Sequence, residues 1–390
     1  MKITLITSER LREFPPVITL LKTLEQLDHQ VTFITPYHDP LFAGLGLTKA
    51  EYLYIAEEPD PHLTRYYSNR IQASLAFHSE RLLRQKHLRR IPDRFAGQLK
   101  NADVVWILHE NTMLLGGKQF VDRLGEYLYT MYELCIKNAD VPEIYDYAAR
   151  KALLTVVPEY CRAHIAKAFY ALPQMPAIIS NKPLEHPRRK HLPISDPGIA
   201  EKMQRIEESG RKIIMYMGIL SSERPLEPII EAVEQTEDYV LAVLGGRTPY
   251  LDQLEQHMGG RFEYLGEVKP PYHLEVASHA DVAYISYVPN NRSINAVFCA
   301  PNKVYEFAGF GIPMLCNDNP GLKFTVEYHA MGVCAPDFNA DSIKAALEQI
   351  DANRDAMGEA ANRYFDGESV ETAVANTLER YLKIKEGKQH

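Results

Sequence analysis

The sequence predicts an α/β fold of two Rossmann-like domains that face a cleft, with additional helices at the C-terminus. Short apolar strands alternate with amphipathic helical stretches in both halves of the chain, which is typical of parallel sheets with helical crossovers. The alternation stops at one segment rich in proline and charge, and then restarts. The 390 residues, 46% of them hydrophobic, are enough for two domains that each bury a core.

The first half opens with a strand–helix–strand unit. Residues 2–7 form an apolar strand, Pro15 and Pro16 begin a helix that runs to Leu27, and residues 30–35 form the next strand. Two strands joined by a helix pair in parallel, so this unit predicts the start of a parallel sheet. Further strands are expected over residues 103–108, 126–130, 153–157 and 177–180.

The break between the halves lies in residues 181–211, which are rich in proline and charge. We expect an N-terminal domain over residues 1–185, a linker that includes a short helix over 186–211 and a C-terminal domain over 212–390. A single large α/β domain is the alternative. In the second half, strands are expected over residues 212–217, 239–244, 262–265, 281–286 and 313–316, and helix alone from about residue 340.

Composition and charge exclude several classes of protein. The formal net charge of −8 makes the chain a poor candidate for a general nucleic-acid binder. Five cysteines without C-x-x-C spacing argue against a cysteine zinc site or a disulfide framework and fit a reducing cytosol. The apolar run at the N-terminus is too short for a signal peptide, and no apolar stretch approaches the ~18 residues that span a bilayer. We therefore expect a cytoplasmic protein.

Residues 64–100 run against the acidic trend, with nine basic and two acidic residues. Aromatic and leucine side chains are interleaved with these charges. A basic amphipathic segment binds anionic lipid or an anionic acceptor, so we expect peripheral contact with the inner face of a membrane. The alternative is an ordinary solvated helix face. The basic residues are Arg65, Arg70, Arg81, Arg84, Lys86, Arg89, Arg90, Arg94 and Lys100.

The segment APNKVYEFAGFGIPMLCNDNP, residues 300–320, carries the most informative pattern. Asn302 begins a predicted helix, Lys303 lies in its first turn, and Glu306 lies one turn later on the same face. A cation beside the N–H groups of a helix start favours a phosphate, and a carboxylate nearby accepts hydrogen bonds from ribose hydroxyls. The alternative is a Lys–Glu pair on the surface of an ordinary helix.

Two further positions in this half follow predicted strands. Gly218 ends the strand over residues 212–217, and Arg224 follows it at the edge where α/β domains bind ligands. The forked charge of arginine suits a diphosphate. Gly245, after the next strand, begins a Gly-Gly turn that lets backbone approach a ligand closely. A surface arginine and a plain turn are the alternatives.

These positions resemble a known family. The order strand–G-x₅-[RK], strand–GG, P-N-K-x-x-E-F-x₃-G-x-P, over about residues 212–333, resembles the donor half of GT-B glycosyltransferases of the retaining group-1 type. The resemblance implies that Arg224, Lys303 and Asn302 hold a donor diphosphate beside Gly218 and Gly245, and that Glu306 binds the ribose. It also implies a loop that approaches the donor sugar, made of Asn317, Asp318 and Asn319.

The first half is expected to contribute the acceptor side and part of the catalytic edge. His109 and Glu110 end a predicted strand, and Glu133 follows the next one. Family members often have a histidine directly before the acid, where this chain has Tyr132. We expect Glu133 and His109 to be catalytic; the alternatives are a helix-start carboxylate and a structural histidine.

The chain also departs from the family pattern. Phe298 stands where many members have the first acid of E-x₇-E, and Ile219 stands where many have an arginine. Residues 7–10 replace the glycine-rich first loop. These departures concern the contacts to the donor sugar more than the fold.

The resemblance implies a hexosyltransferase that moves a sugar, with retention, from a nucleotide-diphosphate sugar such as a UDP-sugar to a glycan or lipid-linked acceptor. Such an enzyme belongs to polysaccharide biosynthesis and needs no cofactor or metal. One alternative is a nucleotide-sugar epimerase or hydrolase of the same fold. The other is a non-catalytic GT-B partner subunit.

Overall fold

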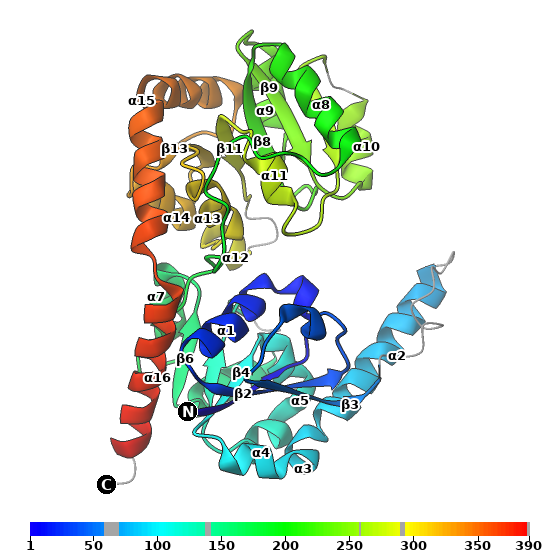
Figure 1. Ribbon diagram of the computed structural model, residues 1–390, viewed down its shortest axis with the longest axis vertical. Coiled ribbons are helices and arrows are strands. Elements are labelled where there is room, and N and C mark those ends of the chain that lie inside the picture. Colours follow the sequence, from blue (N-terminus) through cyan, green and yellow to red (C-terminus); the bar gives the residue numbers. More distant parts are fainter. Residues whose placement is uncertain (58–69, 137–141, 257–258, 289–292, 388–390) are drawn as a thin grey trace. The chain divides into compact units, whose positions relative to one another are not determined.

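The computed structural model describes residues 1–57, 70–136, 142–256, 259–288 and 293–387 (Figure 1). The chain divides into two compact units: Met1–Ser180 with Ser369–His390, and Asn181–Glu368. Each unit contains one sheet in which every paired strand runs parallel to its neighbour, with helices around it. The expected pair of Rossmann-like domains with C-terminal helices is therefore confirmed.

The first sheet has seven strands in the order β3-β2-β1-β4-β5-β6-β7. β1 lies between β2 and β4, with Leu5 opposite Phe33 on one side and Trp106 on the other. These three side chains are fully buried, as expected for a parallel sheet covered on both faces. The strands are β1 (Lys2–Thr7), β2 (Gln30–Tyr37), β3 (Ala50–Ala56), β4 (Val104–Leu108), β5 (Leu128–Thr130), β6 (Leu154–Val157) and β7 (Ala177–Ile178).

The helices of the first unit include the last helix of the chain. They are α1 (Pro15–Gln26), α2 (Arg70–Leu88), α3 (Ile91–Arg94), α4 (Ala96–Asn101), α5 (Glu110–Arg123), α6 (Glu143–Lys151), α7 (Tyr160–Phe169) and α16 (Val370–Gly387), with short 3₁₀ turns at Leu11–Glu13 and Phe42–Leu45.

The second sheet has six strands in the order β10-β9-β8-β11-β12-β13. The strands are β8 (Lys212–Met217), β9 (Tyr239–Leu244), β10 (Phe262–Gly266), β11 (Val282–Ile285), β12 (Met314–Asn317) and β13 (Gly332–Ala335). The helices are α8 (Pro197–Glu208), α9 (Glu227–Glu234), α10 (Pro249–Glu255), α11 (His273–Ala277), α12 (Ile294–Val297), α13 (Asn302–Ala308), α14 (Pro320–Leu322) and α15 (Ala340–Gly367), with a π-helical turn at Lys323–Glu327.

Two of the predicted domain boundaries were wrong. Helix α16 was assigned to the C-terminal domain, but its apolar stripe of Val374, Leu378 and Tyr381 is buried in the core of the first unit. Residues 186–211 were assigned to a linker, but Ile199 and Met203 of α8 are buried in the core of the second unit. Both stretches carry an apolar stripe at helical spacing, and the sequence does not show which core buries it.

Most expected strands lie within two residues of their predicted ends, but β3 and β13 were not predicted. β3 is an edge strand whose side chains are mostly half-buried, and two tyrosines interrupt its aliphatic residues. β13 is four residues long. Among the described residues, no helix is both long and apolar enough to cross a membrane.

Candidate functional site

The strand order reverses at β1–β4 in the first sheet and at β8–β11 in the second. In doubly wound sheets, ligands bind beside such a switch point, at the carboxyl ends of the strands. The loops that follow β1 and β4 in the first unit, and β8 and β11 in the second, are therefore the places where a site is expected.

Two glycines bring the loops after β8 and β9 into contact. The Gly218 N–H donates a hydrogen bond to Leu244 O at 2.9 Å, and Gly218 has a φ of +142°, which side-chain-bearing residues rarely adopt. A Cβ atom on Gly245 would lie only 2.2 Å from Gly218 O. Neither loop could follow this path with a larger residue at these two positions.

Lys303, in the first turn of α13, lies against Gly218. A Cβ atom on that glycine would meet Lys303 Cε at 2.7 Å and Nζ at 2.9 Å. Burial lowers the pKa of the Lys303 ammonium, the charge of Arg224 lowers it further, and Glu306 opposes both effects. Among the described residues, no carboxylate forms an ion pair with Lys303. The partly buried ammonium of Lys303 is therefore repelled by Arg224 and is not paired directly with an anion.

Arg224 lies in the loop after β8, where its own N–H donates to Ser221 O at 2.9 Å. Its guanidinium carbon lies 5.1 Å from the centre of the Tyr287 ring, in the loop after β11. The structure therefore brings together four of the predicted donor residues: Gly218, Arg224, Gly245 and Lys303. Asn302 begins the same helix as Lys303, and in its first turn the Val304 N–H donates to Pro301 O at 3.2 Å.

Glu306 lies one turn after Lys303, with its side chain 16% exposed. Burial alone would raise the pKa of this carboxyl, but a hydrogen bond from His273 and the charge of Lys303 lower it overall. Glu306 Oε1 lies 3.2 Å from Nε2 of His273 on α11. On the other side, His186 Nε2 lies 2.9 Å from Glu306 O. Sequence reasoning missed both histidines, because neither is near α13 along the chain.

In the loop after β12, side-chain amides hydrogen-bond to neighbouring backbone. Asn317 accepts a hydrogen bond from Tyr287 N at 2.9 Å and donates one to Tyr287 O at 2.8 Å. Asn319 donates to Ala296 O at 3.2 Å and also to Tyr287 O. These amides hold neighbouring backbone, and their expected contacts to a donor sugar stay a prediction. Asp318 forms an ion pair with Lys323 at 3.0 Å.

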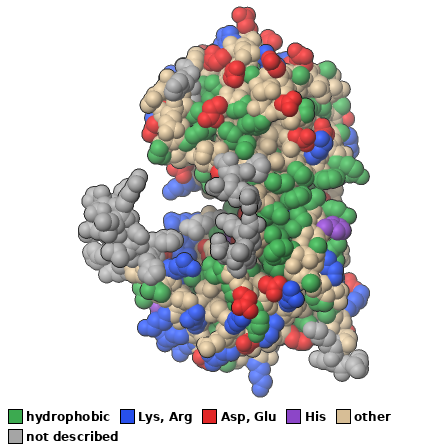
Figure 2. All heavy atoms as spheres, turned by 180° about the vertical axis from the view of Figure 1, so that it is seen from behind, with side chains coloured by type: hydrophobic (Ala, Val, Ile, Leu, Met, Phe, Trp, Pro, Cys, Tyr) green, Lys and Arg blue, Asp and Glu red, His purple; other side chains and the backbone are tan. Residues whose placement is uncertain are grey.

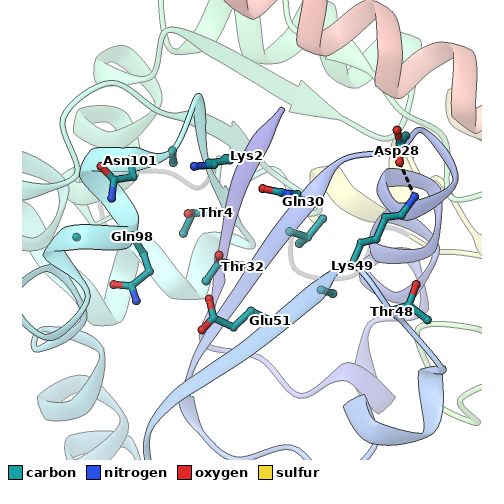
Figure 3. Close-up of a pocket in the computed structure, with 14 residues that line it drawn as sticks. Lys2, Thr4, Asp28, Gln30, Thr32, Thr48, Lys49, Glu51, Gln98 and Asn101 are labelled. Carbon is teal, nitrogen blue, oxygen red and sulfur yellow. Dashed lines mark hydrogen bonds and ion pairs between the residues drawn. The ribbon is translucent and has the colours of Figure 1, made fainter.

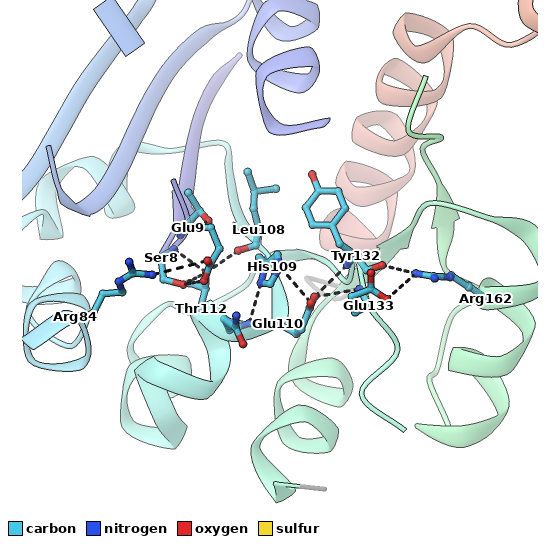
Figure 4. A network of polar contacts seen from close by, with 12 residues as sticks. Ser8, Glu9, Arg84, Leu108, His109, Glu110, Thr112, Tyr132, Glu133 and Arg162 are labelled. Atoms are coloured by element: carbon cyan, nitrogen blue, oxygen red, sulfur yellow. Dashed lines mark hydrogen bonds and ion pairs between the residues drawn. The ribbon is translucent and has the colours of Figure 1, made fainter. Parts of the chain in front are cut away.

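A second polar cluster follows β4 in the first unit (Figure 4). His109 has a φ of +73°, and its Nδ1 accepts a hydrogen bond from Asn111 N at 3.1 Å. The neutral ring must therefore carry its proton on Nε2, which lies 3.3 Å from Glu110 Oε1. Glu110 Oε2 also accepts from Tyr132 N at 3.2 Å and Glu133 N at 3.3 Å. Glu110 is thus the centre of the cluster, although the sequence favoured its neighbours.

Burial sets the protonation of this cluster. It lowers the pKa of His109 to about 3, so the ring is neutral near pH 7. Burial and then the charge of Glu133 raise the pKa of Glu110 to about 8, against the opposing effect of the backbone N–H donors. A carboxyl that titrates near neutral pH is typical of functional sites and also occurs in structural networks.

Glu133 is the exposed member of the cluster. Its side chain is 51% exposed, and Oε2 lies 3.5 Å from Nη1 of Arg162, which is buried. Arg162 also donates a hydrogen bond to Tyr132 O. Its place is fixed because Glu159 accepts from Arg162 N at 2.9 Å and caps helix α7. The structure therefore brings His109 and Glu133 together through Glu110.

Two pockets border the first sheet. One, of about 220 Å³, lies beside the loop after β1 and is lined by Glu9, Glu80, Arg81, Arg84, Asn111, Leu114 and Leu115. The other, of about 880 Å³, lies toward the amino ends of β1 and β2, where Thr4, Gln30 and Thr32 point into it (Figure 3). Only the smaller pocket is at the carboxyl edge of the strands, where the site is expected.

Comparison with solved structures identifies the fold. HepE from Anabaena, in complex with UDP and glucose, matches with a TM-score of 0.67 and 13% identity, over 97% of this chain and 99% of that chain. Sucrose-phosphate synthase from Thermosynechococcus elongatus matches with a TM-score of 0.66 and 14% identity, over 99% and 100% of the two chains. The chain has the GT-B fold.

Other chains that share the GT-B fold differ in what they do. WaaG, a glycosyltransferase involved in lipopolysaccharide biosynthesis, matches with a TM-score of 0.60 and 13% identity, over 97% of this chain and 99% of that one. A putative UDP-N-acetylglucosamine 2-epimerase from Listeria monocytogenes matches with a TM-score of 0.60 and 15% identity, over 96% and 95%. No family model matches the sequence, and no curated protein matches it.

Proposed function

We propose that this GT-B chain is a hexosyltransferase that moves a sugar, with retention, from a nucleotide-diphosphate sugar to a glycan or lipid-linked acceptor. The observation that carries the proposal is the pair of cations at the end of β8. The charge of Arg224 lowers the pKa of the partly buried Lys303, so the two cations repel each other. Keeping two like charges this close lowers the stability of the fold unless an anion binds between them. A diphosphate supplies that anion.

The chemistry of transfer uses the same charges. Breaking the bond between the anomeric carbon and the diphosphate oxygen leaves negative charge on the nucleotide, while the acceptor oxygen bonds to the sugar and releases its proton. Arg224 and Lys303 are held in place before the reaction, so they stabilise the leaving group without reorganising. These side chains supply the cationic charge that a metal ion would otherwise bring, and we propose transfer without a metal.

Glu306 is proposed to bind the ribose. Its lowered pKa makes it an ionised acceptor at neutral pH, and His273 fixes its orientation. UDP is the nucleotide we favour, because structures of HepE hold UDP and UDP-glucose. Asp318 and the backbone of its loop remain our proposed neighbours of the donor sugar.

The acceptor is proposed to bind the first unit. The pocket of about 220 Å³ presents Glu9, Arg81 and Asn111 at the carboxyl edge of the sheet. Glu133 supplies an exposed carboxylate, and His109 and Glu110 hold the backbone from which it projects. We propose Glu133 as the residue that meets the acceptor, and His109 as a positioning residue.

Nucleotide binding tests the proposal. Lys303→Ala and Glu306→Ala are expected to weaken binding of UDP by about 10- to 100-fold in calorimetric titration, since a hydrogen bond to a charged group contributes ~1.5–3 kcal/mol. Titrations with GDP and TDP decide the base. Lys344→Ala, which removes an ion-paired lysine from α15 of the same unit, is the control. Equal UDP affinity in all four proteins would refute the donor site.

The epimerase match makes one alternative specific. An epimerase or hydrolase converts a UDP-sugar without an acceptor, whereas a transferase needs one. Product analysis with and without added acceptor separates the two activities. A third outcome, nucleotide binding without turnover by the single chain, would favour a partner subunit.

Membrane contact through the basic stretch is also proposed. Arg81, Lys86 and Arg90 on and after α2 are exposed, and Figure 2 shows Lys and Arg side chains gathered over the first unit. Arg84 and Arg89 already bind Glu80 and Gly116 O, so they are poor choices for a test. Residues 64–69, including Arg65, lie outside the described residues.

We expect the triple variant Arg81→Gln, Lys86→Gln, Arg90→Gln to sediment less with phosphatidylglycerol vesicles than wild type. Each basic residue near such a surface contributes ~1 kcal/mol. Neutral phosphatidylcholine vesicles are the control. Equal sedimentation of the variant and wild type with anionic vesicles would remove the membrane contact.

A further inference from the structure

Three side chains from distant parts of the sequence meet on the surface of the second unit. His191, Glu207 and His279 each place one ligand-type atom within 4.8 Å of the others. Glu207 Oε1 lies 2.7 Å from His279 Nδ1 and 3.7 Å from His191 Nδ1. We propose that these residues form a binding site for a divalent transition-metal ion, with Zn²⁺ as the reference case.

The orientation of His279 is that of a metal ligand. Its Nε2 lies 2.8 Å from Leu192 O, a carbonyl that can only accept, so Nε2 carries a proton. In the neutral ring the lone pair is then on Nδ1, 2.7 Å from the carboxylate of Glu207, whereas a protonated ring donates a hydrogen bond to that carboxylate. Histidine ligands commonly donate their second N–H to a backbone carbonyl in this way, which fixes the tautomer and orients the ring. A cation between Nδ1 and Glu207 would satisfy both groups.

The spacing of the cluster is close to what zinc needs. Zn–N and Zn–O bonds of ~2.0–2.2 Å place tetrahedral ligands about 3.4 Å apart, so the separations of Glu207 from His279 (2.7 Å) and from His191 (3.7 Å) each change by less than 1 Å. Glu207 and His191 are largely exposed, at 41% and 67%, and can adjust, whereas His279 is 11% exposed. Two imidazoles and one carboxylate leave a fourth position for water.

The backbone around His191 is tied to the segment that carries His279. The His191 N–H donates to Ser278 O at 3.1 Å, and the Leu192 N–H donates to Ser278 Oγ at 2.9 Å. The backbone positions of the two histidines therefore keep their spacing without the metal. Such preorganisation reduces the entropy that ligand binding must overcome.

The site is separate from the proposed donor site. Asp281 N donates to Ile213 O, so His279 and Glu207 lie beside the amino ends of β11 and β8. Gly218 follows the carboxyl end of β8, a strand of six residues at ~3.3 Å per residue. The metal would thus join α8 and the end of α11 to residues 191–192, and its role is structural.

The test uses the full chain, stripped with chelator and titrated with ZnCl₂ by calorimetry. One equivalent is expected to bind, and Zn²⁺ is expected to raise the unfolding midpoint. His191→Gln and His279→Gln are each expected to weaken that binding at least tenfold. His191 is exposed, so its variant folds even if the His279 variant does not. His329→Gln, an exposed histidine of the same unit, should bind zinc as wild type does.

Cobalt(II) distinguishes this site from the cysteine thiols. At Cys135 or Cys161 the bound ion would give thiolate charge-transfer bands, and at the histidine–glutamate site it would not. Absence of binding, thiolate bands in the wild-type spectrum, or zinc affinity unchanged in both cluster variants would overturn the proposal.

Discussion

At Gly218 and Gly245, the absence of a side chain decides where Lys303 can lie. Gly218 leaves room for the lysine stem, and Gly245 leaves room for the carbonyl of Gly218. The ammonium therefore reaches the end of β8 from a helix that begins 85 positions later in the chain. A single methyl group at either glycine would compete with this arrangement.

Gly218→Ala is expected to lower both stability and nucleotide affinity. The new Cβ would lie 2.7 Å from Lys303 Cε at a φ of +142°, and such backbone strain costs ~1–3 kcal/mol. Urea denaturation and UDP titration measure the two effects. Gly97→Ala, at a helical glycine with no atom within 4 Å of the added Cβ, should be neutral or slightly stabilising. An alanine at position 218 that changes neither quantity would contradict this account.

Lys303→Met is expected to leave the ligand-free protein as stable as wild type, or more stable. The substitution removes the ammonium group, whose pKa is lowered by burial and by repulsion from Arg224. It keeps most of the apolar part of the lysine side chain. Saturating UDP should then raise the unfolding midpoint of wild type much more than that of the variant. A large loss of stability without ligand would indicate that Lys303 is a structural residue instead.

Sequence analysis identifies residues that lie together in the structure where chemistry and spacing along one helix coincide. Lys303 and Glu306 are one helical turn apart, so their pairing is visible in the chain. His273 contacts Glu306 from another helix, and the spacing of residues along the chain does not predict that contact. Asn317 and Asn319 show what spacing leaves out, because polar residues in a strand-end loop also hold neighbouring backbone.

At the scale of elements, Glu110 connects the start of α5 to the turn after β5. Its carboxyl group meets His109 on its own loop and the N–H groups of Tyr132 and Glu133 on the other. The sequence placed these residues at the ends of neighbouring strands, and the parallel pairing of β4 with β5 brings them together. Which carboxylate is central depends on side-chain packing, which strand prediction does not include.

Stability should depend on pH through this network. The pKa of Glu110 is raised from 4.5 to about 8, so the stability from its protonated form is complete below pH 4.5 and is lost as pH rises toward 8. The pKa of His109 is lowered from 6.5 to about 3, so its contribution is lost only as pH falls below 6.5. Between pH 6.5 and 8, Glu110 is the member of this pair that titrates.

Glu110→Gln tests that sign. From pH 6.5 to 8, the unfolding free energy of wild type should fall relative to that of the variant by up to ~1.4 kcal/mol per pH unit. Above pH 8 the difference should level off. Denaturation at matched ionic strength measures it. A difference that stays constant, or moves in favour of wild type, over this range would show that Glu110 is ionised throughout.

At the scale of the whole molecule, α16 completes the first unit from the far end of the chain. Val374, Leu378 and Tyr381 are buried beside the N-terminal strands and α1, and Tyr381 Oη donates to Glu126 O at 3.1 Å. The fold class was predictable from alternation alone, since each half repeats it. The sequence does not predict which unit contains α16, because an amphipathic helix can pack on any apolar surface of suitable shape.

Leu378→Ala should destabilise the first unit by ~2–5 kcal/mol, the usual cost of emptying a buried leucine site. The chain has a single tryptophan, Trp106, buried in β4 of the same unit, so its fluorescence reports unfolding there. Asn376→Ala, exposed on the same helix, is the control. UDP affinity should not change in either variant. If the transition followed by Trp106 is unaltered, α16 does not stabilise this unit.

The path of the chain through the second unit has a practical consequence. Lys182, just after the chain enters this unit, donates hydrogen bonds to the carbonyls of Phe365 and Glu368, just before it leaves. The second unit is therefore a continuous insertion whose two ends meet at one lysine. A short Gly-Ser bridge in place of residues 181–368 would rejoin the first unit, and linking the two ends would allow circular permutation of the second.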